Sequence, residues 1–393
     1  MKILIAPGTF KGSLTAVEAG EAMAAGVKAA MPDVNVVLVP VGDGGEGTSA
    51  ALHRVVPGGD VVRTEVMGPT GRPVSASFVL LGPNRRTAAL DMASAAGLLL
   101  APEQDRNPMR ATTFGVGELI RQALSHNAVT QIVIGLGGSA TSDCGAGCLQ
   151  ALGYRLLDSD GGVLNSPLLP PDLSRVARID DSKSERRLQH LDVVLACDVD
   201  NPLCGVRGAS RVFGPQMGAT PDMVDRLDDL LRHFGGVLDR FARERGQATG
   251  GPAIGDRPGA GAAGGLGAAL MSVFPRATVT PGIDVVLDAA EFGRLLEGAD
   301  LVLTGEGRLD MQTLGGKAID GVLRRASAVG VPTVAIVGSA EPEAVDRLRG
   351  RGLVRSIQLV DMAGSIEAAI RDAAKLVSRA AESAVGAIHA GSG

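Results

Sequence analysis

The stretch ILIAPGTFKGSLTAVEAGEAMAAGVKAAMPDVNVVLV, residues 3–39, decides the fold class of this chain. It begins and ends with apolar runs, Ile3–Ala6 and Val36–Val39, that have the length of buried strands. Between them, Thr15-Ala-Val-Glu18 is a capping box that begins a helix, and the helix ends ahead of a proline. Strand, helix and strand in this order form one βαβ unit, so the stretch predicts a parallel sheet.

Similar apolar runs alternate with helical patterns along much of the chain, which favours a sheet covered by helices. The further runs that we expect to be buried strands are Ile132–Ile134, Val193–Ala196, Leu301–Leu303 and Thr333–Val337. Near the C-terminus, apolar residues recur every three or four positions from Ile366 onward. This spacing predicts one amphipathic helix from about Ser365 to Ile388.

The pattern changes in the middle of the chain. Val61–Val66 and Val74–Leu81 look like antiparallel strands around the turn Met67–Gly71. We therefore expect an α/β protein of two α/β domains. The first is a discontinuous, Rossmann-like domain, residues 1–66 and 285–393, and the second is an inserted mixed α/β domain, residues 67–284.

Composition excludes several classes of protein. Of 393 residues 45% are hydrophobic, so disorder is not expected, and the net charge of −5 argues against nucleic acid or an anionic membrane as the main partner. No run approaches 18 apolar residues and no signal peptide is recognised, which predicts a cytoplasmic protein. The four cysteines lack disulfide or zinc spacing and are expected to be free thiols. The five histidines stand near no nucleophile, which argues against histidine acid–base chemistry.

Glycine makes up 55 residues, about twice its usual share, and gathers in loops that follow strands. The loop Ala6–Ser13 places Lys11 at the end of the first strand, where it is either a ligand for phosphate or carboxylate or a solvated lysine. The loop Val41–Gly47 carries Asp43 and Glu46 among three glycines. Two such carboxylates favour magnesium, a cation or a substrate hydroxyl nearby, or else Glu46 is only a charge in the first turn of a helix.

The loop Gly135–Asp143 follows a strand and matches the pattern G-x-G-x-x-A, with Asp158 at about the right distance beyond it. That pattern is the dinucleotide fingerprint, but Gly259–Gly264 matches the same glycine spacing without a preceding strand, so the match is weak evidence. The hydroxyls of this loop, from Ser139, Thr141 and Ser142, suit phosphate oxygens better. The chain contains neither a P-loop nor the motifs of a protein kinase.

Two further loops combine acidic and basic residues. Asp198, Asp200 and Asn201 follow a strand and suit either magnesium, the hydroxyls of a polyol or a structural turn. The segment Thr304–Lys317 holds more polar function than a turn requires, namely Glu306, Arg308, Asp310, Gln312 and Lys317. Since ligands of open α/β sheets bind beyond the carboxyl ends of strands, we expect this segment to lie near the loops of Lys11 and Asp43.

Taken together, these segments resemble the glycerate kinase family of bacterial type, and the resemblance extends over nearly the whole chain. Seven ordered motifs carry it: APGTFKGSLTA at 6–16, PVGDGGEGT at 40–48, IGLGGSATSDCGAG at 134–147, ACDVDNPLCG at 196–205, FGPQMGA at 213–219, PGAGAAGGLG at 258–267 and TGEGRLDMQTLGGK at 304–317. The resemblance implies two α/β domains with the active site in the cleft. It also implies phosphorylation of D-glycerate by ATP with Mg²⁺, with 2-phosphoglycerate favoured over 3-phosphoglycerate as the product.

For the individual residues we form hypotheses from the needs of phosphoryl transfer. Lys11, Arg308 and Lys317 hold the charges of phosphate and carboxylate, and Asp43 or Asp198 is the general base. The residues placed near magnesium are Glu46, Asp200 and Glu306. The residues placed around the ATP phosphates are Gly137, Gly138, Ser139, Thr141 and Asp143, with Gly261, Gly264 and Gly265 nearby.

One departure from the family pattern keeps alternatives open. Where the family usually has Ala-Pro-Asp-Ser-Phe-Lys, this chain has Gly8 and Thr9, and Gly42 replaces the usual alanine. If the missing aspartate binds substrate or metal, the chain is a catalytically silent homologue that still binds glycerate or nucleotide. A nicotinamide-dependent oxidoreductase that uses the Gly135 fingerprint is the more remote alternative.

Overall fold

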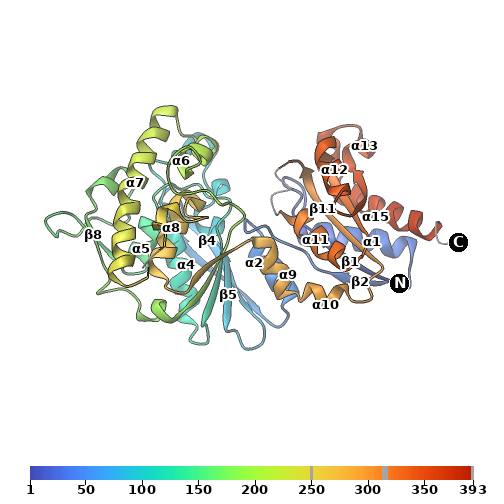
Figure 1. The fold of residues 1–393 in the computed structure, drawn as a ribbon, viewed down its shortest axis with the longest axis horizontal. Helices are drawn as coiled ribbons and strands as arrows, with labels where there is room; N and C mark the ends of the chain where they lie inside the picture. The colour runs from blue at the N-terminus through green and yellow to red at the C-terminus, as the bar shows by residue number, and fades with distance from the viewer. Residues whose placement is uncertain (248–250, 312–316, 391–393) are drawn as a thin grey trace. The chain divides into compact units, whose positions relative to one another are not determined.

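The computed structural model describes residues 1–247, 251–311 and 317–390 of the chain (Figure 1). The chain divides into two compact units. Unit 1 comprises Met1–Asp43, Ala50–Pro57 and Pro281–Gly393, and unit 2 comprises Gly44–Ser49 and Gly58–Thr280. Unit 1 is thus assembled from both ends of the chain, and unit 2 comes almost entirely from its middle.

Unit 1 contains a five-stranded sheet in which every neighbouring pair is parallel. Its strands, in spatial order, are β13 (Leu353–Gln358), β12 (Thr333–Ala340), β11 (Leu301–Leu309), β1 (Lys2–Pro7) and β2 (Asn35–Leu38). The apolar runs that predicted strands at both ends of the chain lie in these strands, except that Val39 follows β2, and β2 is half-buried rather than buried as expected. The parallel sheet and the α/β class are therefore confirmed.

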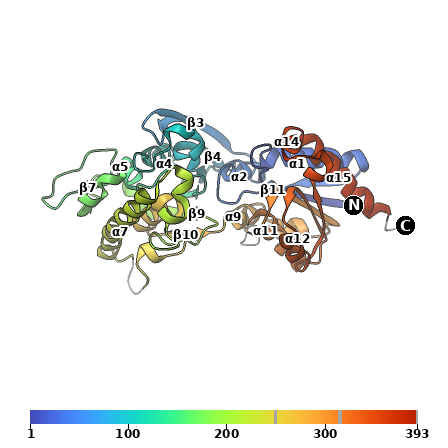
Figure 2. The same ribbon diagram turned by 90° about the horizontal axis from the view of Figure 1, so that it is seen from above.

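Helices cover both faces of this sheet (Figure 2). Alternate residues of β12 show it, since Val334 and Ile336 pack with α1 and α15, whereas Ala335 and Val337 pack with α11 and α12. The helices of unit 1 are α1 (Ala16–Ala30), α9 (Gly282–Ala289), α10 (Phe292–Leu296), α11 (Ala318–Ala328), α12 (Pro342–Arg349), α13 (Leu359–Ala363), α14 (Ile366–Arg371) and α15 (Ala373–Ala390). Helix α2 (Thr48–Val55) begins in unit 2 and continues in unit 1.

The predicted capping box is present at the start of α1. The Thr15 hydroxyl accepts from the Glu18 amide at 3.2 Å, and the Glu18 carboxylate accepts from the Thr15 amide at 2.8 Å. Helix α1 packs against α15 so closely that a Cβ on Gly26 would lie 1.9 Å from the carbonyl oxygen of Ser378. Glycine is thus required where the two backbones approach each other.

The prediction of a single C-terminal helix from Ser365 to Ile388 is wrong in one respect. The structure has two helices, α14 and α15, separated at Asp372. Ile366 and Ile370 are exposed, so the apolar stripe is buried only from α15 onward. Aspartate also disfavours a helix interior, which gives a physical reason for the break.

Unit 2 contains a six-stranded mixed sheet. In spatial order its strands are β10 (Ala277–Thr280), β9 (Asp192–Ala196), β6 (Gln131–Gly135), β5 (Thr87–Asp91), β4 (Pro73–Leu81) and β3 (Asp60–Met67). The strands β5, β6, β9 and β10 are parallel, and β3–β4–β5 is an antiparallel meander that includes the predicted hairpin. All of β3 pairs with β4, so this sheet already begins at Asp60, before the expected boundary after Val66.

The helices of unit 2 enclose a single apolar core. They are α3 (Ala93–Ala96), α4 (Phe114–Ser125), α5 (Ala146–Ala151), α6 (Ala209–Phe213), α7 (Pro221–Glu244) and α8 (Leu266–Val273), and a small two-stranded sheet joins β7 (Arg155–Leu157) to β8 (Arg178–Asp180). The core brings Phe78 of β4 and Leu90 of β5 together with Phe234 of α7 and Phe274, which follows α8. The long helix α7 is capped by Thr220, whose hydroxyl accepts from the Met223 amide.

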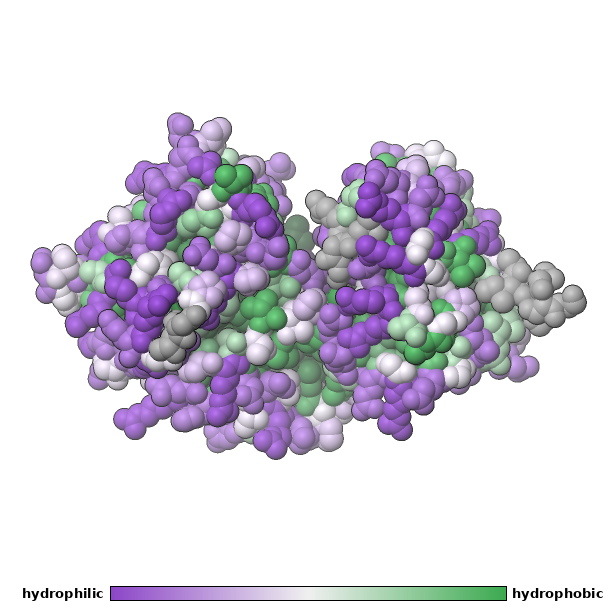
Figure 3. All heavy atoms as spheres, in the orientation of Figure 1, coloured by the Kyte–Doolittle hydropathy of each residue, from purple (hydrophilic) through white to green (hydrophobic). Residues whose placement is uncertain are grey.

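Hydrophilic side chains predominate on the face drawn in Figure 3, and apolar residues appear there only in small groups. Among the residues that the structure describes, no helix is long and apolar enough to cross a membrane. All four cysteines are free, as expected, and three of them are buried. Burial raises the pKa of the Cys197 thiol to about 11, so this thiol is protonated at neutral pH.

Candidate functional site

The carboxyl edge of the sheet in unit 1 gathers several of the charged residues that the sequence singled out. The chain passes from β1 to β2 on one side and later returns to β11 on the other side. The strand order therefore reverses between β1 and β11, and in open α/β sheets ligands bind beyond the strand ends at such a switch point. The residues that follow β1 and β11 are the loop of Lys11 and the segment Glu306–Asp310.

These two segments touch each other directly. The Gly8 amide donates to the carbonyl oxygen of Gly305 at 2.8 Å, which prolongs the pairing of β1 with β11. Beyond it, a Cβ on Gly307 would lie 3.0 Å from the amide nitrogen of Lys11. Lys11 itself is exposed. The structure thus holds the backbone of the lysine loop against β11 and leaves the ammonium group accessible.

Arg308 lies at the end of β11 and is already ion-paired. Its guanidinium donates to the Glu341 carboxylate at 2.9 Å and lies 3.8 Å from the carboxylate of Asp310. The hydrogen bond with Glu341 raises the pKa of Arg308 above its ordinary value. Any anion that binds Arg308 would therefore have to compete with Glu341, a residue that the sequence did not single out.

The remaining residues of this edge are half-buried. Glu306 lies on β11, and Lys317 occupies the cap position ahead of α11. Asp43 follows Val41, whose amide donates to the carbonyl oxygen of Pro7 at 2.9 Å, so this loop runs alongside the end of β1. Residues 312–316 of the segment Thr304–Lys317, which include Gln312, lie outside the described residues.

In unit 2 the loop from Gly137 to Asp143 follows β6 at the carboxyl edge of the parallel strands. Gly138 has a φ of 80°, a left-handed conformation that glycine adopts without strain. The hydroxyls of Ser139 and Thr141 are 2.8 Å apart, and the Thr141 amide donates to the Ser139 hydroxyl at 3.0 Å. Both side chains are buried, so these hydroxyls hold the loop in shape.

Asp143 is fully buried beneath this loop. Its carboxylate accepts from the amide and the hydroxyl of Thr113, both at 2.8 Å, and from the amides of Gly145 and Gly147 at 3.1 and 3.2 Å. Burial raises the pKa of Asp143, and these hydrogen bonds oppose that rise. Asp143 therefore fastens the loop to the start of α4 and does not face solvent.

The second glycine segment packs directly on the first. The Cys144 amide donates to the carbonyl oxygen of Gly264 at 3.1 Å, and a Cβ on Gly264 would lie 1.9 Å from the carbonyl oxygen of Thr141. Gly265 approaches the backbone of Cys144, and the Gly261 amide donates to the carbonyl oxygen of Asn201. The structure thus brings the two glycine segments together.

Asp91, at the end of β5, is a buried carboxylate that the sequence analysis missed. It accepts from the Gly47 amide at 2.9 Å and from the amide and hydroxyl of Ser49 at 3.0 and 2.9 Å. Burial raises the pKa of Asp91 to about 6 in spite of these hydrogen bonds. The carboxylate ties the segment Gly44–Ser49 to the sheet and leaves Glu46 of that segment exposed. The sequence did contain a signal for Asp91, namely an aspartate directly after a short apolar run.

The acidic loop after β9 is only partly available for a ligand. Asp200 pairs with Arg207 at 2.5 Å, and this hydrogen bond lowers the pKa of Asp200. The Asn201 amide group donates to the carbonyl oxygen of Arg207 at 2.7 Å, and Asp198 is half-buried. Asp158, the acidic residue of the fingerprint hypothesis, accepts from the amides of Asp160 and Gly162 in a local turn.

The expected magnesium residues belong to three separate segments: Glu46 and Asp200 lie in loops, and Glu306 lies on β11. Within the described part of the chain, no group of three or more His, Cys, Asp or Glu side chains is arranged to hold a metal ion. A dedicated cage of protein ligands therefore does not fit. Magnesium in phosphoryl-transfer sites is usually bound by one or two carboxylates together with substrate phosphates. One or two carboxylates from Glu46, Asp200 and Glu306, together with substrate phosphates, fit this way of binding Mg²⁺.

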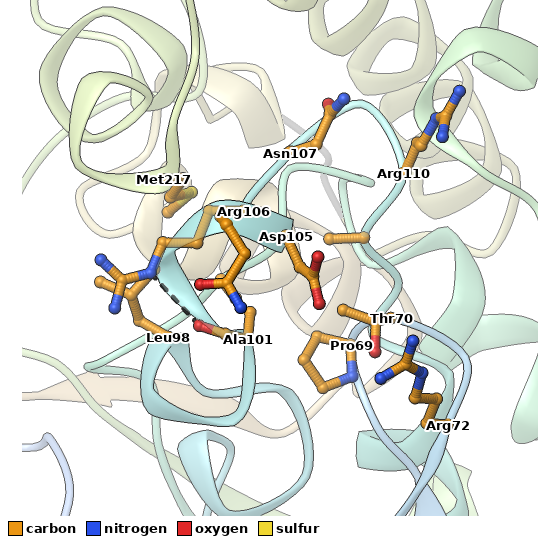
Figure 4. Close-up of a pocket in the computed structure, with 13 residues that line it drawn as sticks. Pro69, Thr70, Arg72, Leu98, Ala101, Asp105, Arg106, Asn107, Arg110 and Met217 are labelled. Carbon is orange, nitrogen blue, oxygen red and sulfur yellow. Dashed lines mark hydrogen bonds between the residues drawn. The ribbon is translucent and has the colours of Figure 1, made fainter.

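A pocket of about 370 Å³ opens at the carboxyl edge of the sheet in unit 2 (Figure 4). Its wall includes Ala140 of the Gly137–Asp143 loop and three arginines, Arg72, Arg106 and Arg110, none of which the sequence analysis selected. Arg72 is far from Arg106 and Arg110 in the sequence, so only the fold brings it to the same pocket.

The fold and these two edges define an α/β protein whose charged and glycine-rich loops lie beyond the ends of parallel strands. The model of the glycerate kinase family matches residues 3–389, and the chain therefore belongs to this family.

Similar proteins agree with this assignment. The chain is 43% identical to the glycerate kinase of Bacillus subtilis over 97% of this chain and 96% of the relative. It is 40% identical to the glycerate 2-kinase of Escherichia coli, with the same coverage. A crystal structure from Salmonella typhimurium LT2, described as a candidate glycerate kinase 2, superposes with a TM-score of 0.83 at 40% identity. It covers 100% of this chain and 99% of that one.

Proposed function

We propose that the protein phosphorylates D-glycerate with ATP as the donor and favours 2-phosphoglycerate over 3-phosphoglycerate as the product. The observation that carries the proposal is the gathering of Lys11, Asp43, Glu306 and Arg308 at the switch point of the sheet in unit 1. The choice of glycerate and of its 2-hydroxyl rests on the similarity to the Escherichia coli glycerate 2-kinase.

In this proposal the transfer is direct. The glycerate hydroxyl oxygen attacks the γ-phosphorus of ATP, the bond from that phosphorus to the β-phosphate oxygen breaks, and ADP leaves. Asp43 or Asp198 accepts the hydroxyl proton. Lys11, Arg308 and Lys317 neutralise the carboxylate of glycerate and the charge on the transferred phosphate, and Arg308 exchanges Glu341 for the substrate.

The loop of Gly137, Gly138, Ser139 and Thr141 is proposed to lie against the ATP phosphates, backed by Gly261, Gly264 and Gly265. Asp143 has a positioning role in this scheme, because its buried carboxylate fixes the loop. Mg²⁺ accompanies the nucleotide and screens the phosphate charge, with carboxylates from Glu46, Asp200 and Glu306 as its candidate protein ligands.

ADP release with D-glycerate as the acceptor tests the assignment of the base. Asp43→Asn or Asp198→Asn is expected to lower kcat by at least 100-fold, because a lost general base typically costs that much, while ATP binding stays unchanged. Asp160→Asn, an exposed turn residue, is the matched control. Unchanged kcat in both base variants would contradict the assignment.

A catalytically silent homologue is the second candidate, and Gly8 is the observation that favours it. A Cβ at Gly8 would lie 2.8 Å from the Cβ of Ala318, so this chain has no room for the family's usual aspartate without a shift of α11. The silent homologue predicts binding of ATP or glycerate with no ADP released above the rate without acceptor.

A further inference from the structure

The proposed roles leave the pocket of unit 2 unexplained (Figure 4). Only Ala140 among its lining residues belongs to a loop with an assigned role. Its polar lining residues include Arg72, Gln104, Asp105, Arg106, Asn107 and Arg110. A cavity lined mainly by polar side chains requires a polar occupant.

The pocket lies where an α/β sheet places its ligands. Its walls come from the turn between β3 and β4, from the segment that follows β5 and from the loop that follows β6, which all lie at the carboxyl edge of the parallel strands. Backbone hydrogen bonds join two of these walls, because Leu98 donates to Gly138 at 2.8 Å and Ala140 donates to Ala96 at 2.9 Å. Backbone hydrogen bonds therefore hold the Gly137–Asp143 loop in the wall of the pocket.

The charge of the lining favours an anion. The lining contains three guanidinium groups and one carboxylate, that of Asp105, so its net charge is plus two. Within the described ranges none of these three arginines forms an ion pair. The Nε of Arg106 donates to the carbonyl oxygen of Ala101 at 3.3 Å, which orients this side chain and leaves its two terminal nitrogens for a ligand.

Figure 4 shows how these side chains lie. Arg106 and Arg72 stand on opposite sides of the pocket with Asp105 between them, and the guanidinium group of Arg110 is directed outward at the rim. Two arginines on opposite walls suit a chain of phosphates better than a single small anion. A guanidinium group binds phosphate oxygens in a bidentate manner, which a lysine does not do.

Size distinguishes the two anionic substrates of the reaction. A volume of about 370 Å³ lies within the range of pockets that enclose drug-sized ligands, and glycerate, with three carbons, fills only a small part of it. We propose that this pocket binds the triphosphate chain of the nucleotide between Arg72 and Arg106. The proposal rests on the kinase function proposed above and assigns residues to the nucleotide that the sequence hypotheses do not contain.

Calorimetric titration of the full-length protein with ATP and with inorganic tripolyphosphate tests this assignment. Arg72→Gln and Arg106→Gln are each expected to raise the Kd for both ligands about tenfold, since each removes a charged hydrogen-bond donor. The effect shrinks from ATP to ADP to AMP and disappears for adenosine. Arg110→Gln has a smaller effect because its guanidinium group points outward.

Two controls separate binding from folding. Arg63→Gln removes an exposed arginine on the same hairpin outside the pocket and is expected to leave the Kd within twofold. Arg106→Lys keeps the positive charge, and partial recovery of affinity relative to Arg106→Gln shows that the charge acts on the ligand. The thermal unfolding midpoint of each variant confirms that it folds.

Three results would overturn the proposal: wild-type protein that binds neither ATP nor tripolyphosphate, unchanged Kd values in Arg72→Gln and Arg106→Gln, or a loss of affinity for D-glycerate alone. The last result assigns the pocket to glycerate. Turnover is measured on the same samples. Wild-type protein that binds ATP through these arginines but releases no product with D-glycerate contradicts the proposed function and leaves the pocket assignment standing.

Discussion

At the level of single residues, Asp91 sits where burial and hydrogen bonding have opposite effects on ionisation. Its pKa rises from 3.8 to about 6, so the folded protein binds a proton that the unfolded chain has already lost between those pH values. The stability that Asp91 contributes is therefore complete below the unfolded pKa and is lost as the pH rises through about 6.

We expect this loss to appear in a comparison with Asp91→Asn, which cannot titrate. Between pH 5 and pH 7.5 the wild type should lose roughly 1.4 kcal/mol of stability relative to the variant, one pKa unit of linkage. Thermal unfolding of both proteins at the two pH values measures it. If the difference in stability between wild type and Asp91→Asn is the same at both pH values, burial does not raise the pKa of Asp91.

Asp143 makes a second prediction at this scale. In Asp143→Ala the amides of Thr113, Gly145 and Gly147 lose a buried acceptor, and each unsatisfied group costs about 1–3 kcal/mol. The unfolding midpoint should fall by roughly 6 °C or more. Asp160→Ala, which removes an exposed carboxylate, should change it little. Equal midpoints for the two variants would mean that Asp143 does not hold the loop.

At the level of elements, the end of β1 packs against the start of α11 through Gly8 and Ala318. A Cβ at Gly8 would lie 2.8 Å from that of Ala318, closer than real Cβ atoms approach. Gly8→Ala should therefore destabilise the protein by about 1–3 kcal/mol, and adding Ala318→Gly should restore much of the loss. Gly293→Ala, where a Cβ meets nothing within 4 Å, is the control in thermal unfolding. If Ala318→Gly does not restore stability to Gly8→Ala, the contact between the two Cβ atoms is not the cause of the destabilisation.

The helices and strands also show which parts of the structure the sequence could predict. The strands of the unit 1 sheet and the hairpin of β3 and β4 were predictable because buried strands and turns have local patterns. The break at Asp372 was not, because the same apolar spacing continues through it while Ile366 and Ile370 stay exposed. Burial depends on what else packs there, and a local pattern does not contain that information.

The candidate site shows the same division. Lys11, Asp43 and Arg308 were predictable as residues of strand ends, because that position follows from the parallel sheet. The partner Glu341 and the role of Asp91 were not, because each depends on a contact between segments distant in the sequence. The pocket of Arg72 and Arg106 was missed for the same reason.

At the level of the whole molecule, the chain has a net charge of −5 and concentrates positive charge locally. The lining of the pocket in unit 2 is such a place, because it holds three arginines and one aspartate. Under the proposed function, a positive region of this size fits a small anionic substrate, whereas a polyanion such as nucleic acid needs an extended basic surface. Most of unit 2 is inserted between the N-terminal and C-terminal parts of unit 1 along the chain. One continuous chain therefore supplies the candidate residues of both units.

The most direct test of the account is a phosphorus NMR time course of the purified protein with ATP, magnesium and D-glycerate. The account predicts that the ATP signals decay while ADP and the phosphomonoester signal of 2-phosphoglycerate grow together, with no product when glycerate is omitted. ATP signals that stay constant in the presence of D-glycerate, from protein that binds ATP, would contradict it and identify a silent member of the family.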